Sequence, residues 1–236
     1  MVILLLDYVN KNNNIINIDI GYYYYLYTDK NNDIEIIMLI FYYANNNNNI
    51  ILNINGTYKN PLLEAISRND IEMIKLLINY ANSNHIVLDI NYRKNYGYDE
   101  YPLYYAVYKN NVEIVKLLID YANQHNIIMD INDSKKENSY SYRKDKKYLL
   151  YYAVSNNNIE MVKLLIDYAN QHNINLNVND KPEKSDYPLV RASHHNNLEM
   201  INILNEYAHN HNVLLKNDCY DLSYETYHFL NDKVNI

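Results

Sequence analysis

Glycine, cysteine and tryptophan are scarce or missing in this chain of 236 residues, which has three glycines, one cysteine and no tryptophan. Three scattered glycines cannot form the phosphate-binding loops GxxxxGK or GxGxxG. The single cysteine, Cys219, cannot form an internal disulfide, and without a placed base we interpret it as inert rather than nucleophilic. The motifs HExxH, CxxC and GxSxG are missing as well. The sequence therefore predicts no enzyme, no cofactor and no metal ligands.

Long apolar runs and an excess of basic charge are also lacking. The longest apolar run, residues 34 to 43, is interrupted by Glu35 and has about half the length that spans a bilayer. The formal net charge is -7, whereas phosphate binding needs a basic face. Residues 1 to 9 are apolar but lack the basic start and cleavage site of a signal peptide. We therefore expect a monomeric, cytoplasmic protein without a nucleic-acid, membrane or small-molecule partner.

Hydrophobic residues, tyrosine and asparagine are abundant. Hydrophobic residues make up 48% of the chain, which is enough to build a core, and 29 residues are tyrosine. Asparagine is far above ordinary usage. Because isoleucine, asparagine, lysine and tyrosine share AT-rich codons, we interpret this bias as genomic first and functional second.

One unit recurs along the chain, which is typical of repeat architectures. The clearest copies are 58 to 82, 99 to 123, 146 to 170 and 185 to 209, and 21 to 45 is a weaker one. Equivalent glutamates stand 37, 41, 47 and 39 residues apart at Glu35, Glu72, Glu113, Glu160 and Glu199. Residues 2 to 20 match only the second half of the unit. No unit can bury both of its faces, so each must stack on the next.

Each unit is predicted to hold a short helix and a longer one. Proline at Pro61, Pro102 and Pro188 suits a first helical turn, and the short helices are expected to end near Ser67, Tyr108, Ser155 and His194. A polar pair such as Asn110-Asn111 then caps the next helix. In the longer helix of residues 112 to 123, Val112, Val115, Leu118 and Ile119 are expected to form the apolar side. Glu113 and Lys116, three residues apart, are expected to support that helix.

The pattern PLxxA, a polar turn and EIVKLL resembles the ankyrin repeat over about residues 21 to 215. The resemblance implies an all-α solenoid of about five repeats, extended finger loops between repeats, and a concave binding groove lined by the fingers and first helices. Residues 1 to 20 would be a partial N-terminal repeat, and 216 to 236 a partial cap or a docking tail. Tetratricopeptide and HEAT units also pair helices, but their helices are usually of similar length and joined by short links.

Two departures from the ankyrin pattern carry expectations. The Thr-Pro-Leu-His motif is replaced, for example by Tyr101-Pro-Leu-Tyr104, so its hydroxyl-to-imidazole bond is not expected. Tyr-Ala-Asn stands where the family has a glycine cap, so the second helices are expected to run on through Gln124-His125 and Gln171-His172. Residues 127 to 132 and 174 to 179 alternate apolar and polar side chains, as strand-like fingers would.

Two further features have a functional and a structural interpretation, and the structural one is favoured. His85, His125, His172 and His211 follow Tyr-Ala-Asn, but packed helices lie too far apart for a ladder of metal ligands. They suit polar positions near helix C-termini. The basic segment 133 to 147 is either a site that binds an acidic partner or accepts phosphate on its serines and tyrosines, or a solvated insert.

Positions that differ between copies predict where a partner binds. They fall where the resemblance places the groove, at the end of the first helix and two residues before the proline or its substitute. They are Lys59, Ser67, Arg68, Glu100, Tyr108, Lys109, Lys147, Ser155, Asn156, Asp186, His194 and His195. The leading hypothesis is a module that binds a partner protein through this groove. The alternative is a structural spacer or assembly segment of a longer array without a specific partner.

Overall fold

The computed structural model describes residues 11, 15–27, 33–46, 49–57, 59–93, 101–132 and 148–216. The predictions for Glu100, Lys147, Cys219, the basic segment 133 to 147 and the C-terminal cap at 217 to 236 lie outside these residues. The chain divides into two compact units, Met1–Tyr92 and Arg93–Ile236. Among the described helices, none is both long and apolar enough to cross a membrane.

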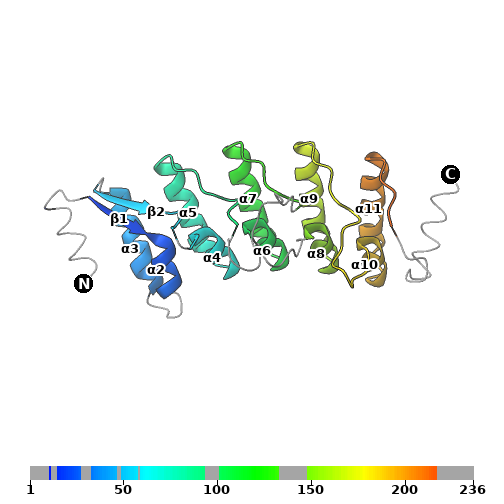
Figure 1. Ribbon diagram of the computed structural model, residues 1–236, viewed down its shortest axis with the longest axis horizontal. Helices are drawn as coiled ribbons and strands as arrows, with labels where there is room; N and C mark the ends of the chain where they lie inside the picture. The colour runs from blue at the N-terminus through cyan, green and yellow to red at the C-terminus, as the bar shows by residue number, and fades with distance from the viewer. Residues whose placement is uncertain are drawn as a thin grey trace. The chain divides into compact units, whose positions relative to one another are not determined.

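The first unit has two helix pairs and a small sheet. Strand β1 (Ile16–Asp19) is followed by α2 (Ile20–Tyr27) and α3 (Asp33–Asn46), and strand β2 (Ile50–Asn53) is followed by α4 (Pro61–Ser67) and α5 (Ile71–Ser83). The two strands pair in parallel with Ile16 opposite Ile50 (Figure 1). Successive extended segments therefore lie side by side, because one helix pair separates them.

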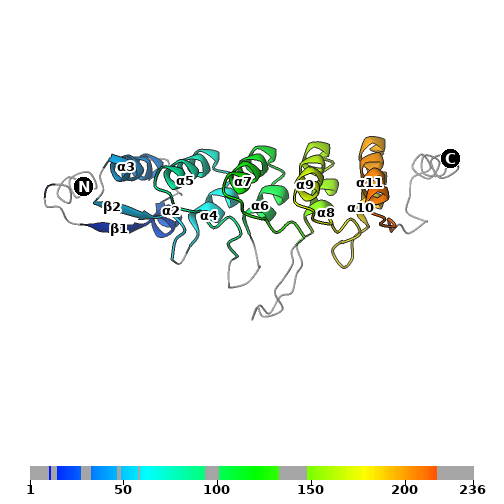
Figure 2. The same ribbon diagram turned by 90° about the horizontal axis from the view of Figure 1, so that it is seen from above.

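The second unit has three helix pairs in its described part. They are α6 (Pro102–Tyr108) with α7 (Val112–Gln124), α8 (Leu149–Ser155) with α9 (Ile159–Gln171), and α10 (Pro188–His194) with α11 (Leu198–Asn210). Short helix α8 packs between α6 and α10, and long helix α9 packs between α7 and α11. Figures 1 and 2 both show a layer of short helices beside a layer of long ones.

The helix bounds confirm most of the predicted framework. Pro61, Pro102 and Pro188 occupy the first helical turn, and the short helices end at the four expected residues. The small residues Ala65, Ala106, Ala153 and Ala192 are fully buried. In α7 the buried side chains are Ile114, Val115, Leu118, Tyr121 and Ala122, so Ile114 belongs to the core in place of the half-buried Val112 and Ile119.

Asparagine takes over the left-handed cap that glycine usually provides. The long helices do reach Gln124 and Gln171, but the chain then turns through Asn126 and Asn173, each at φ 54°. The backbone N–H of Ile127 bonds the carbonyl of Ala122 at 2.8 Å, which closes the helix end. Asparagine tolerates this conformation because its short amide can bond locally. The long helices therefore run on as expected, to Gln124 and Gln171, and end in a left-handed asparagine where the family has a glycine.

The asparagine pairs between short and long helices have two separate tasks. The first member, Asn69, Asn110, Asn157 or Asn196, adopts positive φ and ends the short helix. The second member caps the long helix: the Asn111 side chain accepts from the N–H of Ile114 at 3.0 Å, and Asn158 accepts from Met161 at 2.9 Å. The side-chain amide of Asn158 also donates to Asn110 Oδ1 of the preceding pair at 2.7 Å. The pairs thus turn the chain and link neighbouring repeats.

A buried tyrosine near the end of α5, α9 and α11 anchors the preceding extended segment. The Tyr168 hydroxyl accepts a hydrogen bond from the N–H of Met129 at 2.8 Å, and Tyr207 does the same for Leu176. In the first unit, Tyr80 accepts from Leu52 at 3.2 Å. Burial raises the pKa of Tyr168 and of Tyr207, so both hydroxyls stay protonated at neutral pH. We call this contact the tyrosine staple.

Asparagine side chains link successive extended segments. Asn132 donates to the carbonyl of Asn175 at 2.7 Å and accepts from the N–H of Asn177 at 3.1 Å. Asn55 binds Val87 and Asp89 in the same way, and Asn179 binds Leu214 and Lys216. Residues 127 to 132 and 174 to 179 are extended and alternately exposed, yet neither is a strand, which corrects that prediction. Side-chain amides stand in for the backbone ladder there.

Ion pairs join the long helices rather than support single ones. Lys116 Nζ lies 2.5 Å from Glu160 Oε1, and Lys163 Nζ lies 2.8 Å from Glu199 Oε1. Lys116 therefore pairs with the next long helix. Because these side chains are more than half exposed, each pair contributes only about 0 to 1 kcal/mol.

Two of the glycines are explained by one close approach in the first unit. A Cβ on Gly21 or on Gly56 would lie 1.8 Å from the carbonyl oxygen of Lys59. Gly56 also has φ +67°, a conformation that disfavours other side chains. The segment before α4 therefore depends on both glycines.

Replacing Asp89 with asparagine is expected to raise the Tm at pH 7. Burial raises the pKa of Asp89, only partly offset by a backbone hydrogen bond from Asn91, so the ionised carboxylate is less favourable in the folded state than in the unfolded state. This penalty is present above the folded pKa and disappears below the unfolded pKa of about 3.9. Asparagine removes it and keeps the backbone bond to Asn55. Thermal melts at pH 7 and pH 3 check the prediction, since the gain must shrink at pH 3.

Candidate protein-binding face

The exposed side of the short helices in the second unit gathers half of the predicted binding positions. Three helical positions per repeat point to this side, at three, six and seven residues after the first residue of the helix. They are Tyr105, Tyr108 and Lys109 on α6, Tyr152, Ser155 and Asn156 on α8, and Arg191, His194 and His195 on α10. We call this surface the short-helix face.

Tyrosines from α6 and α8 form a contiguous aromatic cluster on the short-helix face. The Tyr108 ring stacks on Tyr104 with centroids 5.6 Å apart and meets Tyr152 edge-on at 5.6 Å. Tyr104 and Tyr152 are 5.8 Å apart, so the three rings are in mutual contact. Tyr104 is 8% exposed and Tyr108 is 51% exposed. A buried ring thus holds an exposed ring in place, and we call this trio the tyrosine platform.

The Tyr152 phenol of the platform stays protonated at neutral pH. Burial raises the pKa of Tyr152, and the neighbouring phenols of Tyr108 and Tyr151 raise it further, although a hydrogen bond with Tyr104 opposes the shift. Neutral phenols donate and accept hydrogen bonds while their rings provide apolar contact. The platform therefore suits an apolar side chain next to a polar backbone.

A polar cluster lies beside the platform, between α8 and α10. Arg191 Nη2 is 3.1 Å from Asp186 Oδ2 and donates to the Tyr151 hydroxyl at 3.4 Å. His194 Nδ1 lies 3.6 Å from the same Asp186 oxygen, and His195 Nε2 lies 3.1 Å from the carbonyl oxygen of Ser155. The structure therefore brings Asp186, Ser155 and the two histidines together.

Tyr151 links the platform to this polar cluster. Burial alone would raise the pKa of its phenol, but the Ser185 hydroxyl and the Arg191 guanidinium beside the oxygen outweigh burial and lower the pKa. Its ring centroid is 5.7 Å from Tyr152. Tyr151 therefore contacts both Arg191 and the aromatic rings.

The predicted positions of the first unit are engaged within their own helix. Ser67 Oγ donates to the carbonyl of Glu64 at 2.8 Å, and Arg68 Nε donates to Glu64 Oε1 at 3.0 Å. The Arg68 guanidinium also lies 5.8 Å from the centre of the Tyr24 ring. Lys59 is half-buried. Arg68 thus contacts both its own helix and a tyrosine of α2.

Sequence reasoning missed five contributors to the short-helix face and its supports: Tyr104, Tyr105, Tyr151, Tyr152 and Arg191. The signal was present in the doubled tyrosines of PLYYAVY and LLYYAVS, where the second tyrosine of each doublet corresponds to Arg191 in PLVRASH. One residue of each doublet is buried and the other is half-buried. The doublets resemble residues of the repeat framework, so the half-buried tyrosine of each was overlooked as a binding residue.

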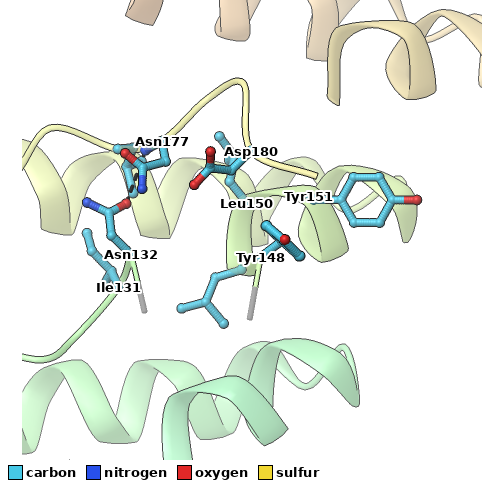
Figure 3. A pocket seen from close by; sticks show the side chains of 9 residues that line it. Ile131, Asn132, Tyr148, Leu150, Tyr151, Asn177 and Asp180 are labelled. Atoms are coloured by element: carbon cyan, nitrogen blue, oxygen red, sulfur yellow. Dashed lines mark hydrogen bonds between the residues drawn. The ribbon is translucent and has the colours of Figure 1, made fainter. Parts of the chain in front are cut away.

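The cavity closest to this face is too small for an organic ligand. It has a volume of about 10 Å³ and is lined by Ile131, Asn132, Tyr148, Leu149, Leu150, Tyr151, Leu176, Asn177 and Asp180. That volume suits about one water molecule. Figure 3 shows Asn132 beside Asn177, while the Tyr151 ring points away from both. The hydrogen bond between Asn132 and Asn177, which we call an asparagine bridge, thus lies in one wall of this cavity.

The histidines that follow Tyr-Ala-Asn are placed by tyrosine rings. His125, His172 and His211 stack over Tyr121, Tyr168 and Tyr207, with centroids 4.0 to 4.3 Å apart. His172 Nε2 also lies 3.1 Å from Asn123 Oδ1 of the preceding repeat. Within the described residues, no group of three or more histidine, cysteine or acidic side chains is arranged to hold a metal ion.

Short and long helices in alternation, each pair followed by an extended segment that bonds to the next, define a helical repeat protein. The match to a family model identifies which kind. A model described as ankyrin repeats, in three copies, matches residues 26–132 and 127–217. These ranges cover well over half of the chain, which therefore belongs to the ankyrin-repeat family. A search of curated proteins gives no significant match. Ankyrin repeats generally mediate protein–protein interaction and are typically not enzymes.

Proposed function

We propose that this chain is a protein-binding module that holds a partner on the short-helix face of its second unit. The observation that carries the proposal is Tyr108, a large aromatic side chain that is half exposed and yet fixed by two neighbouring rings. An exposed ring that is already ordered loses little conformational entropy when a partner covers it. Tyrosine is also among the residue types that most often dominate binding energy at interfaces.

The remaining predicted positions extend this proposal around the platform. Lys109 follows Tyr108 at the end of α6, and Ser155, Asn156, His194 and His195 end α8 and α10. Asp186 precedes α10 and holds Arg191. Lys59, Ser67 and Arg68 are proposed partner contacts of the first unit, and Glu100 and Lys147 remain predictions for residues beyond those described.

Capture of a partner from native cell extract is expected to depend on Tyr108 and Lys109. The intact chain is immobilised beside a Tyr108→Ala, Lys109→Ala variant, and bound proteins are compared by mass spectrometry. Losing a central aromatic anchor costs about 2 kcal/mol or more, so the partner is expected to fall at least about tenfold. Thermal melts by circular dichroism establish that both proteins are folded.

A matched control carries the same types of change elsewhere. Tyr42 on α3 is 65% exposed, and Lys163 lies on a long helix, so Tyr42→Ala with Lys163→Ala is expected to keep the partner. If the Tyr108 variant and the intact chain capture the same proteins, the face is not the binding site. The alternative, a structural spacer without a specific partner, would then be favoured.

A further inference from the structure

The chemistry of the short-helix face changes along the second unit from aromatic to cationic. At one helical position the three short helices carry Tyr105, Tyr152 and Arg191. At the next exposed position they carry Tyr108, Ser155 and His194. Because α6, α8 and α10 pack in that order, the rings lie at one end of the face and the guanidinium and imidazoles at the other.

The charge of this face is opposite to that of the chain. The described short helices of the second unit and their adjoining turns carry Lys109 and Arg191 against one carboxylate, Asp186. The long helices α7, α9 and α11 carry six carboxylates against two lysines. A hollow of about 320 Å³ between α9 and α11 is lined partly by Asp167 and Glu206. The short helices of the second unit thus lack the excess of carboxylates that its long helices carry.

Arg191 is not fully satisfied in its present position. Its Nη2 atom is shared between Asp186 and Tyr151, whereas Nε is buried and has no hydrogen-bond partner among the described residues. A buried donor without a partner is unfavourable, because it has lost its hydrogen bonds to water. A carboxylate supplied from outside would allow the guanidinium to turn and pair through two N–H groups. The ion pair with Asp186 is one-third exposed, so it is weak enough to exchange.

We propose that the short-helix face binds an extended acidic peptide, with an apolar anchor on the tyrosine platform and a carboxylate that takes Arg191 from Asp186. This inference rests on the proposed function and specifies the chemistry of the partner. Neighbouring packed helices lie about 8 to 10 Å apart. An extended chain advances about 3.3 Å per residue, and Tyr152 on α8 is one helix spacing from Arg191 on α10, so the carboxylate follows an anchor that reaches Tyr152 by about three residues.

Fluorescence anisotropy with three labelled peptides tests the proposal on the full chain. The first peptide is Gly-Ser-Phe-Ser-Gly-Glu-Glu-Ser-Gly, the second replaces both glutamates with lysine, and the third replaces phenylalanine with alanine. At low ionic strength the glutamate peptide is expected to bind at least about tenfold more tightly than either of the others. Equal or tighter binding of the lysine peptide overturns the proposal, as does no binding of the glutamate peptide.

Two variants separate exchange of the ion pair from a structural role. Asp186→Asn removes the internal competitor and is expected to tighten binding of the glutamate peptide about threefold or more, whereas Arg191→Gln is expected to weaken it about tenfold. Structural damage would shift both variants in the same direction, which contradicts the exchange. Lys163→Gln, on a long helix, serves as the control and is expected to change nothing.

The outcome also distinguishes this inference from the proposed function. If no acidic peptide binds but a natural partner is still lost with Tyr108→Ala, the face binds a protein of other chemistry. If the glutamate peptide binds and Asp186 and Arg191 act in opposite directions, the acidic peptide is established as the class of ligand.

Discussion

Replacing Tyr168 with phenylalanine is expected to lower the free energy of unfolding by about 1 to 3 kcal/mol, although only one oxygen atom is removed. The hydroxyl accepts from the N–H of Met129 and donates to the carbonyl of Ile127, and both Tyr168 and Met129 are 2% exposed. Water cannot replace the lost acceptor in so buried a site. The Met129 N–H is then left without a partner, which costs its full desolvation.

Chemical denaturation and hydrogen exchange check this expectation. Tyr108→Phe is the control, because that ring is 51% exposed and water can bond any group that the lost hydroxyl leaves. The free energy of unfolding is expected to change by no more than about 0.5 kcal/mol. In Tyr168→Phe, protection from hydrogen exchange should fall more at the Met129 amide than at the helical amides of α9. Unchanged stability and unchanged Met129 protection would show that the staple contributes nothing.

The staples divide the tyrosines into two populations with different tasks. Tyr80, Tyr168 and Tyr207 are almost fully buried and hold backbone groups of the preceding extended segment. Tyr108 and Tyr152 lie on the short-helix face. Because both populations share one residue type, the high tyrosine content alone cannot separate recognition from stability. The separation follows from the helical position of each tyrosine.

Much of the fold could be predicted because its determinants are local. Proline at Pro61 and Pro188 sets the start of a short helix, and the polar pair that follows sets its end. The staples and the asparagine bridges could not be predicted, since Tyr168 and Met129 are 39 residues apart. Both kinds of contact join residues of neighbouring repeats. The hydrophobic periodicity of the sequence reports only contacts within one repeat.

The candidate site was only partly predictable for a related reason. Divergence between copies indicates Tyr108 and His194, which end their helices and are exposed. It does not indicate which neighbours hold them, and the buried Tyr104 beneath Tyr108 looks like ordinary core. The pairing of Arg191 with Asp186 depends on the path of the chain before α10, which no helical pattern describes.

Asparagine content, which composition alone attributes to codon bias, has a structural role that can be measured. Asn158→Ala is expected to lower the free energy of unfolding by about 2 kcal/mol. Its side chain caps α9 by accepting from Met161 at 2.9 Å, and loss of such a cap costs about 0.5 to 2 kcal/mol. It also donates to Asn110 at 2.7 Å, a bond worth about 0.5 to 1.5 kcal/mol.

The two contributions of Asn158 can be separated with variants two or more residues away. Asn156→Ala is the control for composition, because this residue is exposed and a change within about 0.5 kcal/mol is expected. Asn110→Gly removes the acceptor and keeps the positive φ of 56°, so it isolates the bond between repeats. A double-mutant cycle between Asn110→Gly and Asn158→Ala should then give a coupling of about 0.5 kcal/mol or more. If the two changes are additive and Asn158→Ala costs no more than Asn156→Ala, asparagine at this position reflects codon usage alone.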